Sequence, residues 1–226
     1  MVPPIANYKH ASYPDGNVTQ FFGLNPARYG KICYPDNTVP GGKYCMGGHN
    51  GIDIVAPWGT PLLAVRDGII GDVKNSPEGY GKHLRMFCDI GEGIVEEWTY
   101  GHCSEILVKV GQHVTAGQVI AKMGNTGFVV SGATPFWKYN PYKGTHLHIG
   151  LRYHRKWDGT GYYSLTVGDL RLVKILNYYN GYFGSVDFAK QLGESIGYKY
   201  TDAQMTKYLT LKSLYAQYQA LLSRAT

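Results

Sequence analysis

The sequence has few charged residues, and those it has are scattered along the chain. Charged side chains account for 17% of its 226 residues, and 22 Lys and Arg against 16 Asp and Glu give a formal net charge of +6. No Lys- or Arg-rich run of the kind that binds nucleic acid occurs, so we expect no nucleic-acid partner. A mild positive charge also suits an anionic polymer as the partner.

The sequence also lacks the long apolar runs that a membrane span or an export leader requires. No run approaches the ~20 apolar residues of a membrane span, and residues 1–16 show neither the basic nor the apolar region of a signal peptide. We therefore expect no membrane span. A protein of this kind that acts outside a cell would be released by lysis, carried on a particle or exported unconventionally.

Cysteine is scarce, and its spacing argues against a zinc finger. No C-x-x-C pair occurs among Cys33, Cys45, Cys88 and Cys103. Cys33 and Cys45 flank a loop rich in Pro, Gly and Asn, so a disulfide between them is one interpretation. The alternative is that all of the cysteines are reduced.

Glycine and tyrosine are abundant, with 30 and 20 residues, and the hydrophobic fraction of 44% allows a substantial core. From residue 52 to about 170, short apolar runs alternate with turns, and those at 83–90 and 94–102 flank a Gly-Glu-Gly turn typical of a hairpin. Because no β-α-β rhythm is present, we predict a mainly β fold with an antiparallel β-sheet core and long groove-forming loops. The acidic side chains of the hairpin are interpreted as a solvated edge: Asp89, Glu92, Glu96 and Glu97.

The pattern changes after about residue 168. Apolar residues spaced by four between Ser185 and Gly197 predict a helix. Residues 201–223 begin with a Thr-x-x-Gln capping box and continue with an apolar stripe at helical spacing, which predicts a helix packed against the main domain or a partner copy. We therefore divide the chain into a loop-rich N-terminal extension packing on the core (1–44), a β domain (45–168) and a small C-terminal α-helical segment (169–226).

Two histidines alternate in "GTHLHIGLR" at 144–152. Alternate positions of a strand share one face, so His146 and His148 are expected side by side, with Leu147 pointing into the core. By itself an H-x-H pair carries little information. Its interpretation depends on the other residues that could reach the same face.

Two further segments supply such residues. In "GGHNGIDIVAP" (47–57), His49 and Asp53 are four apart with Gly51 between them, so an imidazole and a carboxylate converge on space cleared of side chains. A hydrogen bond between the two in a loop is the alternative. His102 of "TYGHCSE" (99–105) ends a predicted strand. Two His and one Asp would make a three-ligand zinc site with an open position for water, beside which other histidines could move protons or hold an oxyanion.

The order H-x-x-x-D, Y-x-H and H-x-H resembles that of the lysostaphin/LytM-type zinc metalloendopeptidases, peptidoglycan hydrolases with the duplicated hybrid motif fold. The similarity covers roughly 45–152 and includes "HNGIDIVAPWGTPLLAVRDGII" and "VKVGQHVTAGQVIAKMGNTG". The resemblance implies that one Zn²⁺ per chain is bound by His49, Asp53 and His148, and that the catalytic pair is His102 and His146. No H-E-x-x-H helix occurs, so the glutamate base of helical metalloproteases is missing.

The activity implied by the resemblance is hydrolysis of amide bonds in peptidoglycan stem or cross-bridge peptides. The protein would then be a bacteriolytic enzyme of cell-wall degradation, an endolysin or a virion-associated lysin, that acts at the bacterial cell wall. We expect a monomer, with the C-terminal helices as the surface for any oligomer. The alternative is a non-catalytic or structural virion or envelope-binding module of the same fold, against which the complete set of five residues argues.

Tyr44 precedes His49 by five residues, and the resemblance suggests that it stabilises the transition state, although a loop tyrosine is the alternative.

The chain departs from the family pattern in an insertion, "FVVSGATPFWKYNPYK" (128–143), which leads into His146. We expect it to form one wall of the groove and to bind substrate through Trp137 and Tyr139. Packing of these aromatic rings against the domain is the alternative.

Overall fold

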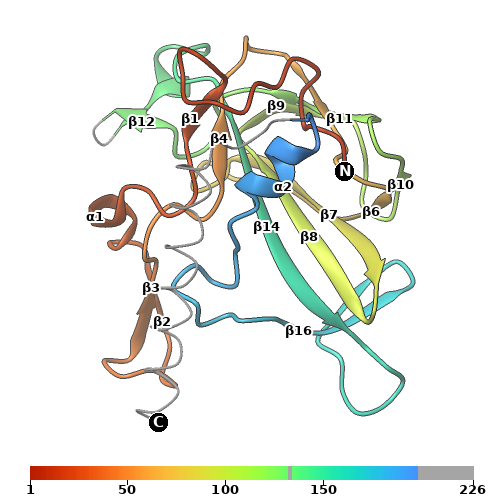
Figure 1. Cartoon of the computed structure of the whole chain (residues 1–226). Coiled ribbons are helices and arrows are strands. Elements are labelled where there is room, and N and C mark those ends of the chain that lie inside the picture. The colour runs from red at the N-terminus through yellow and green to blue at the C-terminus, as the bar shows by residue number, and fades with distance from the viewer. Residues whose placement is uncertain (132–133, 198–226) are drawn as a thin grey trace.

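A long strand, β14 (Leu147–Lys156), runs through the middle of the molecule (Figure 1). The computed structural model describes residues 1–131 and 134–197, and nine strands of that part form one sheet around β14. Its neighbours on either side are β4 (Ile52–Ile54) and β8 (Ile94–Gly101). Beyond them the sheet continues with β1 (Val18–Gln20) on the β4 side and, on the β8 side, with β7 (Lys82–Gly91), β6 (Gly68–Asn75) and β10 (His113–Val114).

Shorter elements surround the main sheet. The hairpin of β15 (Leu165–Val167) and β16 (Leu170–Ile175) pairs with the far end of β14. A smaller sheet contains β5 (Pro61–Leu63), β11 (Val119–Met123) and β9 (Cys103–Ile106). Separate hairpins are made by β2 (Cys33–Pro35) with β3 (Lys43–Cys45), and by β12 (Val130–Ser131) with β13 (Thr134–Pro135). The short helices of the described residues are α1 (Pro26–Tyr29), the 3₁₀ helix η1 (Phe136–Lys138) and α2 (Ala189–Glu194).

The pairing confirms the predicted mainly β fold. Among the described residues, every pair of named strands is antiparallel. The predicted hairpin is the pair β7–β8, with Gly91, Glu92 and Gly93 at positive φ in its turn. The interpretation of this hairpin as a solvated edge is wrong for Glu96 and Glu97, which are each only 3% exposed. Both lie on β8, which has a strand on either side.

One face of β14 packs on the hydrophobic core. Leu147, Ile149 and Leu151 alternate along the strand and belong to this core. Ile149 lies opposite Tyr100 of β8, and both are fully buried. Because successive side chains of a strand point to opposite faces, the residues between them are left for the other face of the sheet.

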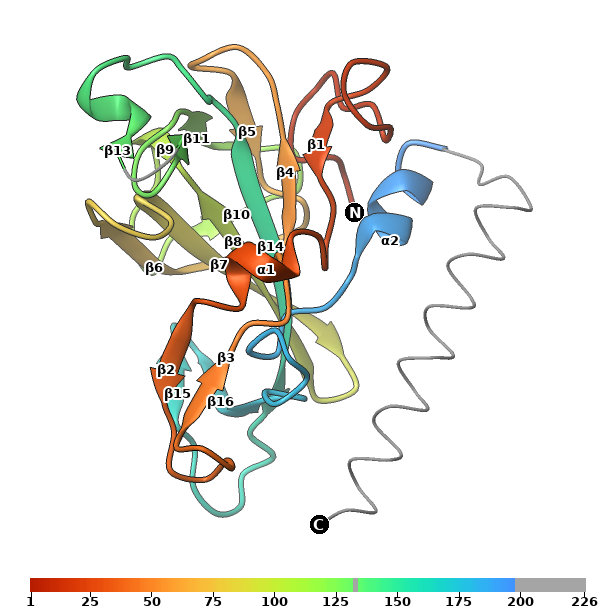
Figure 2. The same ribbon diagram turned by 90° about the vertical axis from the view of Figure 1, so that its left-hand side faces the viewer.

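The C-terminal part of the described chain covers the core face. Helix α2 lies inside the segment predicted to be helical, and the Asp187 carboxylate accepts the backbone N–H of Ala189 at its start. Phe188 packs edge-on against Trp98, and both views show α2 beside the N-terminus (Figures 1 and 2). The predicted boundary at residue 168 lies within the β15–β16 hairpin, and the division into three units stays a prediction. The helix predicted over 201–223 lies outside the described residues.

A disulfide closes the β2–β3 hairpin. It joins Cys33 to Cys45, the first of the two alternatives left by the sequence, while Cys88 and Cys103 are free and buried. In the part of the chain that is described, no helix has the length and apolar character to cross a membrane.

Candidate metal centre and catalytic site

The first residues of β14 bring distant segments of the chain into register. His148 lies opposite Asp53 of β4 on one side and opposite Gly101 of β8 on the other. Leu147 is fully buried in the core, as predicted, so His148 points to the other face of the sheet. His146 lies just before β14 and bridges to Gly124, with its backbone N–H donated to the Gly124 carbonyl.

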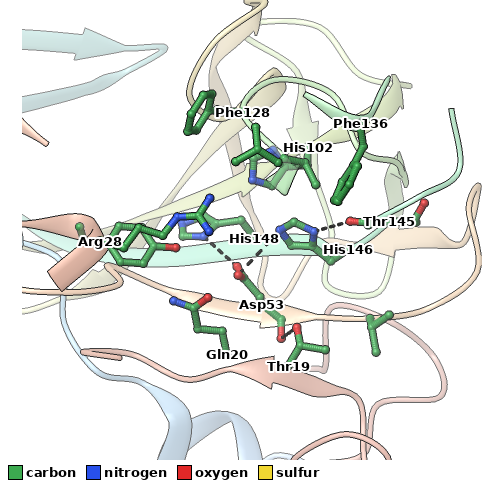
Figure 3. A pocket seen from close by; sticks show the side chains of 15 residues that line it. Thr19, Gln20, Arg28, Asp53, His102, Phe128, Phe136, Thr145, His146 and His148 are labelled. Atoms are coloured by element: carbon green, nitrogen blue, oxygen red, sulfur yellow. Dashed lines mark hydrogen bonds and ion pairs between the residues drawn. The ribbon is translucent and has the colours of Figure 1, made fainter. Parts of the chain in front are cut away.

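A compact His-Asp-His cluster of three buried side chains is formed by His49, Asp53 and His148. Nε2 of His49 lies 2.9 Å from Nδ1 of His148, and Oδ1 of Asp53 lies 3.1 Å from each of those nitrogens. The atoms thus form a nearly equilateral triangle. In Figure 3 the Asp53 carboxylate points toward the histidines from β4, the strand next to β14.

The triangle fits one face of a tetrahedral zinc site. Zn–N and Zn–O bonds of ~2.0–2.1 Å place neighbouring ligand atoms about 3.3 Å apart in a tetrahedron. The three donor atoms, at 2.9, 3.1 and 3.1 Å from one another, need to separate by only a few tenths of an ångström (~0.2–0.4 Å). Two imidazoles and one carboxylate are also the donor types that zinc accepts. The residues present therefore fit a zinc ion, and Asp53 and His148 also line the adjacent cavity.

Contacts around the cluster set the orientation of its members. Nδ1 of His49 lies 3.3 Å from the carbonyl oxygen of Phe21, which can only accept, so Nδ1 is the donor of this contact and, in the neutral ring, Nε2 presents the lone pair. Gly51 has a different role from the predicted one. A Cβ on Gly51 would lie 2.6 Å from Cε1 of His148, so the glycine makes room for the ligand ring itself.

Burial and neighbouring groups shift the pKa values of the cluster toward forms that bind a cation. Burial lowers the pKa of His148 to about 4, although the hydrogen bond with Asp53 opposes this. Burial disfavours ionisation of Asp53, but the adjacent His146 and His49 outweigh it and hold the pKa of that carboxyl well below its usual range. The cluster thus offers an unprotonated imidazole and an ionised carboxylate, the forms that ligate metals.

His102 and His146 form a pair beside the cluster, with ring centroids 4.7 Å apart. Nδ1 of His102 lies 2.8 Å from the carbonyl oxygen of Thr126, and Nδ1 of His146 lies 2.7 Å from that of Gly144. Each Nδ1 therefore carries a proton, and in the neutral ring each Nε2 accepts one. Nε2 of His146 lies 3.8 Å from Oδ2 of Asp53, which places the pair next to the cluster.

The backbone turns sharply at His102, which lies between β8 and β9. Its φ of 62° lies in the left-handed region, which a residue with a side chain rarely adopts. The backbone N–H of His102 donates to the carbonyl of Tyr80 at 2.7 Å, which holds this conformation. Burial and the nearby His146 and His148 hold the pKa of His102 well below its usual range.

A cavity of about 320 Å³ opens beside these residues, and Asp53, His102, His146 and His148 line it. Figure 3 shows Phe128 and Phe136 above His146 and His148, Thr19 and Gln20 below them, and Arg28 reaching in from the side of α1. Tyr29 also lines the cavity, with its ring centroid 5.2 Å from that of His49. Sequence reasoning missed Arg28 and Tyr29, because no local motif connects them to the histidines.

The remaining predicted residues lie outside the cavity lining. The Tyr44 hydroxyl accepts the backbone N–H of Gly181, and its ring packs on Phe183, 4.9 Å between centroids. Nε1 of Trp137 donates to the Gly127 carbonyl at 3.0 Å, and Tyr139 is 56% exposed. The insertion does contribute to the wall, through residues other than the two predicted to bind substrate: Phe128, Val129, Val130 and Phe136.

Comparison with known proteins places this region in a described family. The model of peptidase family M23 matches residues 47–158. The chain is 41% identical over 97 residues to the uncharacterised lipoprotein YgeR of Escherichia coli (strain K12), which is 43% of this chain and 35% of that protein. It is 36% identical over 103 residues to the peptidoglycan DD-endopeptidase ShyA of Vibrio cholerae, covering 46% of this chain and 20% of that protein.

A third relative is lysostaphin of Staphylococcus simulans, 30% identical over 123 residues, which cover 54% of this chain and 22% of that protein. The chain thus spans between 20% and 35% of the length of these relatives. The similarity is therefore one of a shared domain.

Proposed function

Residues 47–158 belong to peptidase family M23, and from this premise we propose that the protein is a zinc-dependent endopeptidase that hydrolyses amide bonds in peptidoglycan peptides. The observation that carries the proposal is the spacing of the His-Asp-His cluster, whose donor atoms lie 2.9–3.1 Å apart beside an open cavity. One relative, the peptidoglycan DD-endopeptidase ShyA, is named for endopeptidase activity on peptidoglycan and supports the substrate class.

In this proposal, His49, Asp53 and His148 hold the zinc ion. A bound zinc ion supplies an acidified water and a site that polarises a carbonyl oxygen. The chain's own contribution is the pair His102 and His146. Their Nδ1 atoms are engaged by the carbonyls of Thr126 and Gly144, so their Nε2 atoms are the ones that can take a proton from the attacking water or donate to the oxyanion.

The arrangement also excludes part of the solvent from the reaction. Asp53, His102 and His148 are each less than 10% exposed, and the apolar side chains of Phe128, Val130 and Phe136 border the same cavity. In such a setting a hydrogen bond to a developing negative charge is stronger than in water. A lytic role at the bacterial cell wall, as an endolysin or a virion-associated lysin, is the finer part of the proposal.

Mass spectrometry of purified peptidoglycan tests the reaction. We expect digestion to release fragments with new amino and carboxyl ends, and a chelator to prevent it. The His146→Ala variant should keep the fold and bind zinc, but should release no fragments. If the wild-type protein with zinc produces no new amine end, the hydrolase assignment is wrong and a wall-binding module of the same fold is the better description. Lysis of intact cells, followed by turbidity, tests the finer part.

A further inference from the structure

Arg28 presents a charge to the active-site cavity that no described residue neutralises. Its side chain is exposed and lines the same cavity as Asp53 and His146. Across the described residues its guanidinium makes no ion pair and no side-chain hydrogen bond. Figure 3 shows the side chain extending from α1 toward the histidines. Arg28 is therefore available to a ligand bound in the cavity.

The segment that carries Arg28 is anchored to the His-Asp-His cluster. The backbone N–H of His49 donates to the Leu24 carbonyl at 2.9 Å, and the N–H of Gly23 donates to the His49 carbonyl at 2.8 Å. Tyr29, the next residue after Arg28, packs on the His49 ring. The position of Arg28 relative to the cluster is thus set by the fold, and the segment lies before the region matched by the family model, 47–158.

The other residues around the cavity make Arg28 chemically distinct. Among the described residues that line it, Arg28 is the sole Lys or Arg, and Asp53 is the sole carboxylate. The Asp53 carboxylate is occupied by His49 and His148, so it does not neutralise Arg28. On the insertion side the lining is apolar. A ligand that fits both parts carries an anionic group near a small apolar group.

We propose that Arg28 is a specificity-determining residue that binds a free carboxylate of the substrate peptide next to the scissile amide. This inference rests on the proposed function and narrows its substrate class. A guanidinium matches a carboxylate with two parallel N–H···O bonds, which a neutral amide cannot provide. The preferred substrate is therefore an anionic stem peptide, whose small apolar side chains contact Phe128 and Val130, and not an uncharged cross-bridge.

The test compares two cross-linked stem-peptide substrates that differ only in whether the acidic residue beside the scissile bond is a free carboxylate or an amide. For the zinc-loaded wild-type protein, we expect kcat/KM to be about fivefold to tenfold higher for the free carboxylate. Arg28→Gln should bring this ratio close to one, and Arg28→Glu should invert it. The matched control is Lys31→Gln, which removes one positive charge from an exposed residue of the same segment outside the cavity lining, and which should keep the wild-type ratio.

The outcomes separate this inference from the proposed function. If neither peptide nor whole peptidoglycan is cleaved, the proposed function fails and this inference fails with it. The wild-type protein could instead cleave both peptides with equal kcat/KM, or Arg28→Gln could keep the wild-type ratio of the two kcat/KM values. Either result would show that Arg28 does not bind the carboxylate, while the enzyme assignment would stand. Melting temperatures of the variants, expected to equal that of the wild type because both positions are exposed, show that the ratio reports recognition and not unfolding.

Discussion

The ring of Tyr80 stacks on the imidazole of His148, with centroids 4.9 Å apart and ring planes inclined by 29°. The same residue touches the catalytic region in two other ways. Its hydroxyl accepts a hydrogen bond from the Asn50 side chain at 2.7 Å, and its carbonyl accepts the backbone N–H of His102 at 2.7 Å. Tyr80 thus connects a proposed zinc ligand with a proposed catalytic histidine.

Replacing Tyr80 tests whether it positions these histidines. Tyr80→Leu removes the stacked ring and the hydroxyl, and we expect zinc affinity to fall about tenfold or more, as with other contacts that orient metal ligands. Tyr80→Phe keeps the ring and loses only the bond to Asn50, so its affinity should stay close to that of the wild type. Competition with a chromogenic chelator measures both. Unchanged affinity in Tyr80→Leu would show that the stack has no positioning role.

The roles of His146 and His148, which alternate at the start of β14, can be separated by zinc stoichiometry. The wild type and His146→Ala should each bind one zinc ion per chain, whereas His148→Ala should bind far less, because it loses a corner of the donor triangle. Zinc at 100 times its dissociation constant should stabilise the wild type by about 2.7 kcal/mol, read as a rise in melting temperature. The same rise in His148→Ala would contradict the assignment of His148 as a ligand.

The aromatic residues of the insertion differ in their place relative to the cavity. Phe128 and Tyr139 are 50% and 56% exposed, but only Phe128 lines the cavity. Phe128→Ala should therefore raise KM about fivefold through lost apolar contact with substrate, with little change in melting temperature. Tyr139→Ala is the matched control and should leave KM unchanged. An equal rise in KM for both variants would indicate that the whole insertion, not its inner wall, contacts the peptide.

The buried carboxylate of Glu97 predicts a pH dependence of stability. Burial disfavours its ionisation, but the hydrogen bond with His154 at 2.6 Å and the adjacent Arg152 and Arg85 outweigh this and hold its pKa below the usual value. A depressed pKa contributes stability above the unfolded-state value of ~4.3, and this contribution is lost as the pH falls toward the folded-state pKa.

Glu97→Gln should accordingly lower the free energy of unfolding at neutral pH by about 3 kcal/mol, since it leaves the partly buried Arg85 and Arg152 without their anionic partner. Its stability should also vary less than that of the wild type between about pH 5 and pH 3. Denaturant titrations at several pH values measure both effects. The exposed Glu92→Gln on the same hairpin is the control and should alter neither. Parallel pH profiles for wild type and Glu97→Gln would contradict the assignment.

Much of the fold could be predicted from local pattern, but the burial of Glu96 and Glu97 could not. The hairpin at 82–101 and the alternation around His148 follow from spacing, because the period of a strand decides which side chains share a face. The same spacing cannot tell an edge strand from an interior one. Glu96 and Glu97 were therefore expected in solvent, whereas the neighbouring strands bury them and Arg66 and His154 contact their carboxylates.

The sequence by itself determined which residue types were available for the chemistry and that His146 and His148 share a face separate from Leu147, because these are properties of composition and of strand period. Only the tertiary structure decided that β4 and β14 pair so that His148 faces Asp53, and that the donor atoms close to 2.9–3.1 Å. It also decided that Arg28 and Tyr80, and not Tyr44, reach the site. Contacts between segments far apart in the chain depend on how the whole core packs, and no short stretch of sequence encodes them.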